Sequence, residues 1–151
     1  MEPKITVEMT PPDLIKRMGR YPKKLDATLK KTMEASVLHI QGSVPSYPPE
    51  RPGQTYIRTG TLGRTLGVAQ SGNVLGQPDI KLVRPLGASG YQGEFGTNLE
   101  YAPDVIGEGT QKKLFKGRWW TMKTVADRAA KGVVRLHDKA TELMARFLEG
   151  R

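Results

Sequence analysis

Cysteine is absent from this sequence of 151 residues. Its absence excludes disulfides, thiolate catalysis and cysteine-ligated zinc, and it fits a protein that does not depend on an oxidising compartment. Long apolar runs are missing as well. No stretch approaches the ~20 apolar residues that a membrane-spanning helix needs, and residues 1–20 lack the apolar core of a signal peptide. We therefore expect a membrane to play no part in the protein's function.

Metal-ligating and catalytic patterns are equally sparse. The only histidines are His39 and His137, and without cysteine a zinc site would need carboxylates as well, so structural roles are favoured. Glu100, Asp104 and Glu108 recur at a spacing of four and could bind a divalent cation, but the intervening proline and glycine favour a solvated acidic surface. Nucleophile-elbow and phosphate-loop motifs are absent. The sequence predicts neither an enzyme nor a cofactor.

Acidic residues are scarce toward the end of the chain. The net charge is +9, and residues 111–151 carry 11 basic against 4 acidic side chains. Such a positive region favours nucleic acid or an acidic protein surface as a partner. The alternative is that the charges serve solubility and form a few ion pairs. The cations expected to form an exposed patch are Lys112, Lys113, Lys116, Arg118 and Lys123. Aromatic residues interleave with them, which indicates either nucleic-acid contact or a basic loop whose tryptophans anchor the last helix in the core.

Two segments have the apolar periodicity of helices. The first runs from about Pro22 to Gln41, and its apolar stripe consists of Leu25, Leu29, Met33, Val37 and Ile40. The second runs from Trp119 to Glu149, and its apolar positions alternate steps of four and three: Met122, Ala126, Ala129, Val133, Leu136, Ala140, Leu143 and Phe147. We expect this seam to be buried, mainly against a sheet and the first helix. Thr10, Pro11 and Pro12 also predict the start of a short helix.

Prolines cluster between the helical and glycine-rich parts of the chain. Residues 44–53 hold four of the 11 prolines, which makes a helix or a central strand there very unfavourable. We interpret this segment as an extended loop or arm that projects from the domain and contacts another subunit. The residues expected to make that contact are Pro45, Tyr47, Pro48, Pro49 and Arg51.

Short β-type runs broken by glycines fill the middle of the sequence. Ile5 to Met9 alternates apolar and polar residues, and further strands are predicted over 65–71, 80–86 and 91–97. No helix is predicted between the last three, so an antiparallel meander is expected. Residues 101–106 form a short helix or an irregular segment. Together these elements predict a single α+β domain: a small antiparallel sheet of three to five strands, packed against an N-terminal helix and a long C-terminal helix.

Two glycine-containing motifs resemble those of a family of bacteriophage minor tail proteins, known as tail-completion or head–tail joining proteins. The first is Thr59-Gly60-x-Leu62-x-Arg64, which is similar to the family's Thr-Gly-x-Leu-Arg signature. The second contains Asn98, Tyr101 and Ala102, and it resembles the family's Gly-Thr-Asn and Tyr-Ala pattern after a strand. The resemblance covers roughly residues 20–150. This chain differs in that Gly63 displaces the family's arginine by one position.

The resemblance implies a structural protein of the virion, made in the host cytoplasm and placed at the neck or upper tail. Family members join the head connector to the tail tube as parts of rings, commonly six-fold, so a homo-oligomer and contacts with other neck and tail proteins are expected. DNA passes through such a ring, and a basic surface could face it. The alternative is a free nucleic-acid-binding protein that uses its basic C-terminal segment.

Overall fold

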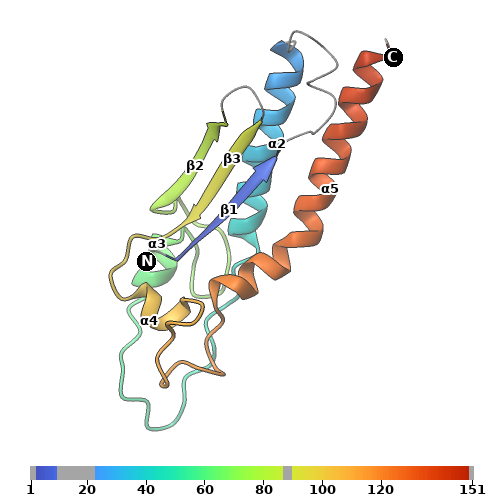
Figure 1. Ribbon diagram of the computed structural model, residues 1–151. Coiled ribbons are helices and arrows are strands. Elements are labelled where there is room, and N and C mark those ends of the chain that lie inside the picture. Colours follow the sequence, from blue (N-terminus) through green and yellow to red (C-terminus); the bar gives the residue numbers. More distant parts are fainter. Residues whose placement is uncertain (1–2, 10–22, 87–89, 150–151) are drawn as a thin grey trace.

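The computed structural model describes residues 3–9, 23–86 and 90–149 (Figure 1). Its elements, in chain order, are β1 (Lys4–Met9), α2 (Lys23–Gly42), α3 (Thr61–Thr65), β2 (Ile80–Pro85), β3 (Tyr91–Gly96), α4 (Ala102–Ile106) and α5 (Met122–Leu148). The helix predicted to start at residues 10–12 lies outside the described residues. The arrangement confirms the predicted α+β fold, with a small antiparallel sheet, an N-terminal helix and a long C-terminal helix.

The sheet has three strands in the order β1-β3-β2, and both neighbours of β3 run antiparallel to it. The register places Val7, Gly93 and Val83 side by side across the three strands. The predicted meander is wrong in one respect, because residues 65–71 do not form a strand. After α3 ends at Thr65, the chain turns at Gly67, whose φ of 69° favours glycine. The strand that pairs with the second edge of β3 is β1.

Helix α2 covers one face of this sheet and uses the predicted stripe to do so. All five stripe residues, Leu25, Leu29, Met33, Val37 and Ile40, are buried. Gly93 of β3 lies where the helix contacts the sheet. A Cβ atom there would be 2.6 Å from the Val37 Cγ2 atom and 2.8 Å from the Met33 sulfur. The absence of a side chain at Gly93 therefore lets the helix approach the central strand closely.

Helix α5 begins later than predicted, at Met122 instead of Trp119. Thr121 is the N-cap: its hydroxyl accepts a hydrogen bond from the Thr124 backbone, and the Thr124 hydroxyl accepts one from the Thr121 backbone. This reciprocal cap ends the preceding turn. Trp119 and Trp120 are buried ahead of the helix, and they fix its entry into the fold.

The predicted α5 seam is correct for most of its length and wrong at its end. Met122, Ala129 and Ala140 are buried as expected, and Val133 packs on the core, but Leu143 is 57% exposed. Phe147 is exposed as well, and the buried positions that the seam missed are Val125 and Met144. A straight helix drifts by about 20° per heptad relative to a 3.5-residue repeat, so a strict four-three seam rotates out of the interface. The interface itself is chiefly with α2 and only to a lesser extent with β1.

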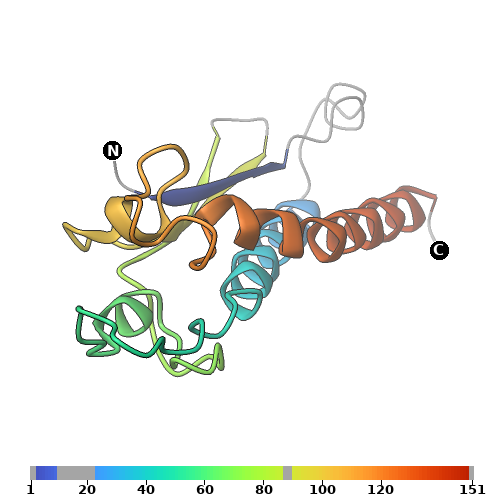
Figure 2. The same ribbon diagram turned by 90° about the horizontal axis from the view of Figure 1, so that it is seen from below.

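Both helices lie on the same side of the sheet, and no other described helix or strand covers its second face (Figure 2). Glu94 stands at the centre of the second face, and its carboxylate accepts contacts from Lys4 at 3.3 Å and Arg84 at 3.4 Å. Gln92 extends this row by donating a hydrogen bond to Glu8. Paired polar side chains thus make up much of this second face, and they bury Glu94 itself.

His137 lies between α5 and α2, where its Nε2 atom is 3.3 Å from the Ser36 hydroxyl. That hydroxyl donates its proton to the Thr32 carbonyl, so the imidazole supplies the N–H for the contact. Burial lowers the pKa of His137, although the adjacent Asp138 opposes the shift. The neutral ring is therefore the form that the folded protein favours.

We expect acidification to weaken the fold through His137. An unfolded histidine keeps its ordinary pKa of about 6.5 and takes up a proton before the folded one does, so stability is full above that pH and falls as the pH drops through it. Thermal unfolding between about pH 5 and pH 7 should show a smaller pH dependence for His137→Gln than for the wild type. The matched control is exposed His39→Gln. Equal pH dependence in wild type and His137→Gln would contradict the prediction.

Candidate functional site

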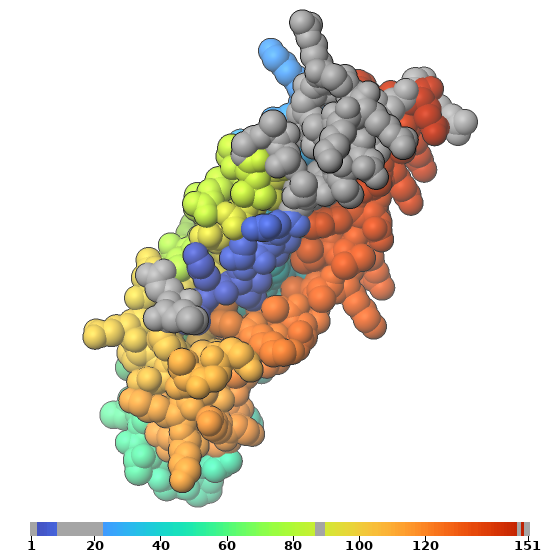
Figure 3. Space-filling model, in the orientation of Figure 1, coloured from blue at the N-terminus to red at the C-terminus, as the bar shows by residue number. Residues whose placement is uncertain are grey.

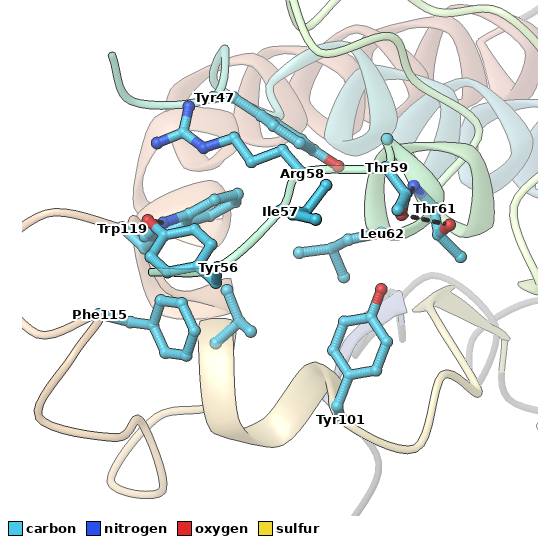
Figure 4. Close-up of a pocket in the computed structure, with 12 residues that line it drawn as sticks. Tyr47, Tyr56, Ile57, Arg58, Thr59, Thr61, Leu62, Tyr101, Phe115 and Trp119 are labelled. Atoms are coloured by element: carbon cyan, nitrogen blue, oxygen red, sulfur yellow. Dashed lines mark hydrogen bonds between the residues drawn. The ribbon is translucent and has the colours of Figure 1, made fainter. Parts of the chain in front are cut away.

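One end of the molecule gathers segments that are far apart in the sequence. The loop that follows α2, the residues around α3, helix α4 and the turn before α5 meet there (Figures 1 and 3). They enclose an open pocket of about 170 Å³ (Figure 4). Its lining residues are Tyr47, Tyr56, Ile57, Arg58, Thr59, Gly60, Thr61, Leu62, Tyr101, Val105, Phe115 and Trp119. We refer to this feature as the aromatic pocket.

Trp119 is the residue on which the wall of the aromatic pocket is built. Its ring centre lies 4.8 Å from that of Tyr47, 6.2 Å from that of Phe115 and 6.3 Å from that of Trp120. Its indole N–H donates a hydrogen bond of 3.1 Å to the Tyr56 hydroxyl. Offset and edge-to-face rings of this kind add packing energy beyond the area they bury. The ring cluster therefore joins three segments into one rigid wall.

Arg58 connects this wall to residues 44–53, which we call the proline-rich loop. Its guanidinium lies 5.4 Å from the centre of the Trp119 ring and 5.9 Å from that of Tyr56. Its terminal nitrogens donate hydrogen bonds to the backbone carbonyls of Pro48 and Pro49. A proline-rich segment has few backbone N–H groups to pair with its own carbonyls, so side-chain donors from other segments can take that place.

The proline-rich loop is held against the domain more firmly than we predicted from the sequence. Val44 is buried in the core, and the Tyr47 backbone donates a 2.7 Å hydrogen bond to the Gln70 carbonyl. Trp120 donates to the Ser46 carbonyl, and Arg118 donates to the Pro49 carbonyl at 3.0 Å. The first half of residues 44–53 is thus part of the packed fold. Only residues 49–53, which include Pro49 and Arg51, are exposed throughout.

Two tyrosine hydroxyls are engaged inside the site. Burial raises the pKa of Tyr47, whose hydroxyl accepts a 2.7 Å hydrogen bond from the Gly63 backbone. Partial burial alone would also raise the pKa of Tyr56, but the hydrogen bond from Trp119 and the nearby guanidinium groups outweigh it, and this pKa is lowered. Both hydroxyls serve to hold the wall together. The accessible part of the pocket is consequently apolar and aromatic, which suits binding of a protein side chain.

The residues that carry the family resemblance divide between the pocket and its surroundings. Thr59, Gly60, Leu62 and Tyr101 line the pocket, although they come from segments about forty residues apart in the chain. Ala102 is fully buried at the start of α4. Two members lie outside the lining: the exposed Arg64, which donates to the Thr61 hydroxyl, and the exposed Asn98, whose backbone donates to the Asp79 carboxylate.

The predicted basic patch is only partly free of internal partners. Lys112 pairs with Asp104 at 2.7 Å, Lys123 pairs with Asp127 at 2.7 Å, and Arg118 is committed to the proline-rich loop. The two cations left without a partner among the described residues are Lys113 and Lys116, and both are exposed. The segment between α4 and α5 is held by Gln111, whose amide donates to the carbonyls of Val105 and Trp119.

Sequence reasoning missed Tyr56, Ile57 and Arg58, which line the aromatic pocket. The available signal was their position, since an aromatic residue, an exposed apolar residue and a cation stand directly before the Thr59-Gly60 motif. Ile57 is 91% exposed, and Tyr101 across the pocket is 45% exposed. Figure 4 shows Ile57 and Leu62 between the Trp119 ring cluster and Tyr101. Ile57 and Tyr101 therefore add exposed apolar surface beside the aromatic pocket.

The fold and the site define an α+β protein with an apolar, aromatic pocket at one end. Comparison of the chain with protein-family models, with curated proteins and with solved structures finds no match. Across the described ranges there is no cluster of three or more histidines, aspartates or glutamates arranged to hold a metal ion. In the same residues, no helix combines the length and apolarity required to cross a membrane.

Proposed function

We propose that this chain is a structural protein of a bacteriophage particle, placed at the neck or upper tail, where it joins the head connector to the tail tube as one subunit of an oligomeric ring. The ring, and the preference for six-fold symmetry, rest on the family resemblance. It also assigns the protein no catalytic activity. Its partners are further copies of itself and other neck and tail proteins.

One observation carries the proposal. The two sequence motifs that resemble the tail-completion family lie about forty residues apart, yet Thr59, Gly60 and Leu62 from the first share a pocket with Tyr101 from the second. Both motifs of the resemblance therefore contribute to one surface. The exposed side chains of Ile57 and Tyr101 give this surface the apolar character of a subunit contact.

The position of the chain in a virus particle tests this proposal directly. Gold-labelled antibodies against the chain, applied to purified particles of the phage that encodes it, should bind at the junction of head and tail. Antibodies against a major head protein are the control, and they should decorate the head alone. Gold label at the tail tip or on the head, or particles that contain none of the chain by mass spectrometry, would refute the proposal.

A further inference from the structure

The two long helices carry a second positively charged surface, on the side of the helix pair that faces away from the sheet. We propose that this surface binds the phosphate backbone of double-stranded nucleic acid. It is separate from the basic turn at residues 112–118 and from the aromatic pocket. The cations that form it, which we call the cationic face, are Lys24, Lys31, Arg128, Arg135, Lys139 and Arg146.

On α5, the spacing of the cations places them along one side of the helix. Arg128 and Arg135 stand four residues before and three residues after Gly132, and Lys139 follows at a further step of four. Arg146 lies seven residues beyond Lys139, which is two turns along the same side. From Arg128 to Arg146 the rise of the helix is about 27 Å. The row is therefore long enough to cross a nucleic-acid duplex.

The neighbouring helix completes this surface. Gly132 lets α2 approach closely there, since a Cβ atom at this position would overlap the His39 ring. Toward the other end of the pair, Lys24 and Arg146 line a common groove of about 740 Å³. Lys31 stands seven residues after Lys24, on the same side of α2. The two helices thus present their cations to one side, and Figure 2 shows the sheet lying to the other side of both.

These six cations are exposed and are not neutralised by the rest of the described chain. Among the described residues, the ammonium and guanidinium groups of these six side chains have no ion pair and no hydrogen bond. Lys24 has its ammonium 4.7 Å above the Phe147 ring, which leaves its charge intact. Asp138 and Glu142 are acidic residues that border the row on α5, three residues after Arg135 and three after Lys139. Unpaired charges of one sign, held on two packed helices, repel one another and are stabilised by a polyanion.

A duplex is the polyanion that matches this surface best. It carries one negative charge about every 1.7 Å along its axis, so a ~27 Å length of duplex holds roughly 16 phosphates on its two strands, and those on the near side face the cations. The basic turn at residues 112–118 is a weaker candidate, because Lys112 and Arg118 are already bound internally. The cationic face makes no base contacts in this proposal. Binding should therefore be independent of sequence and strongly dependent on salt.

The test measures the binding of a short fluorescent DNA duplex to the full chain between about 50 and 200 mM salt. One variant carries Arg128→Gln, Arg135→Gln, Lys139→Gln and Arg146→Gln. Its affinity should fall on the order of 100-fold, and the slope of log K against log salt should decrease by about 3 to 4. Glutamine keeps the helix propensity high, and circular dichroism should show unchanged folding.

The matched control removes the same number of charges from the other basic region, with Lys112→Gln, Lys113→Gln, Lys116→Gln and Lys123→Gln. This variant should bind the duplex almost as tightly as the wild type. The reverse ranking of the two variants would overturn the proposal and place the nucleic-acid surface at the basic turn. Failure of the wild type to bind would also overturn it, as would equal affinity for polyglutamate, which would indicate an acidic protein partner.

This inference goes beyond the proposed function and does not depend on it. The duplex-binding experiment uses the purified chain alone, whereas antibody labelling uses whole virus particles. Duplex binding without label at the head–tail junction would leave the cationic face established and the proposed function refuted. Label at the head–tail junction without duplex binding would support the proposed function and refute the role of the cationic face.

Discussion

Replacing Phe95 by alanine should lower the free energy of unfolding by about 3–5 kcal/mol. Phe95 lies on β3, the central strand, and its side chain has no exposed surface. It packs in the main core cluster together with Val37 and Ile40 of α2. Truncation removes contacts on every side of the ring, and the register with β1 and β2 prevents the strand from moving inward to fill the cavity. Because small domains are stable by only about 5–15 kcal/mol, this single change should remove a large share of the total stability.

The control for this prediction is Leu82→Ala, on the neighbouring strand β2. Leu82 is 43% exposed and pairs with Glu94, so it points to the second face of the sheet. Its truncation should cost less than about 1 kcal/mol. Both variants can be compared with the wild type by urea denaturation followed by circular dichroism. Similar midpoints for Phe95→Ala and Leu82→Ala would show that the core does not lie where the structure places it.

The long helices were the most predictable part of the fold, but their apolar seams were predicted with different success. Every residue of the Leu25–Ile40 stripe is buried, because α2 packs on the sheet and on α5 together and a broad stripe suffices for both. Along α5 the same reasoning works as far as Ala140 and then fails at Leu143. Periodicity indicates that a seam exists, but the crossing of two particular helices decides where the seam ends.

The segment after α3 could not be predicted, because a distant residue determines its conformation. Gln41, at the end of α2, is fully buried and donates hydrogen bonds to the carbonyls of Gly67 at 3.1 Å and Gly76 at 2.8 Å. Those bonds hold residues 67–76 as a loop against the helix. An isolated bridge between Val68 and Val74 is what remains there of the predicted strand. β-type residues alone do not show that such a tertiary contact is present.

The candidate site was predicted in parts, but its assembly was not. The sequence drew attention to the proline-rich loop, the Thr59-Gly60 motif and the basic turn as three separate features. The structure brings all three to one end, since Tyr47 and Phe115 line the same pocket as Thr59. Pairwise ring contacts and donors to proline carbonyls depend on tertiary packing. Composition indicated the chemistry of these residues without indicating that they meet.

Replacing Trp119 by alanine should have the second large effect, about 3–5 kcal/mol of lost stability. Trp119 is 7% exposed, and its ring contacts Tyr47, Phe115 and Trp120. Its loss also deprives the Arg58 guanidinium of an aromatic partner. Because Arg58 and these rings hold the proline-rich loop, the destabilisation should be local as well as global. Hydrogen exchange should accelerate most in residues 44–60, while the α2 amides keep more of their protection.

Two further variants separate ring packing from simple loss of apolar surface. Leu114→Ala removes a side chain from the same segment, but Leu114 is 50% exposed, so little change is expected. Trp119→Phe keeps an aromatic ring and loses the indole N–H that donates to the Tyr56 hydroxyl, so its cost should lie between the other two. If Trp119→Ala and Leu114→Ala show the same stability and the same exchange in residues 44–60, Trp119 does not organise this end of the molecule. If the Trp119 ring organises this end, stability should rise from Trp119→Ala through Trp119→Phe to the wild type. Hydrogen exchange in residues 44–60 should slow in the same order.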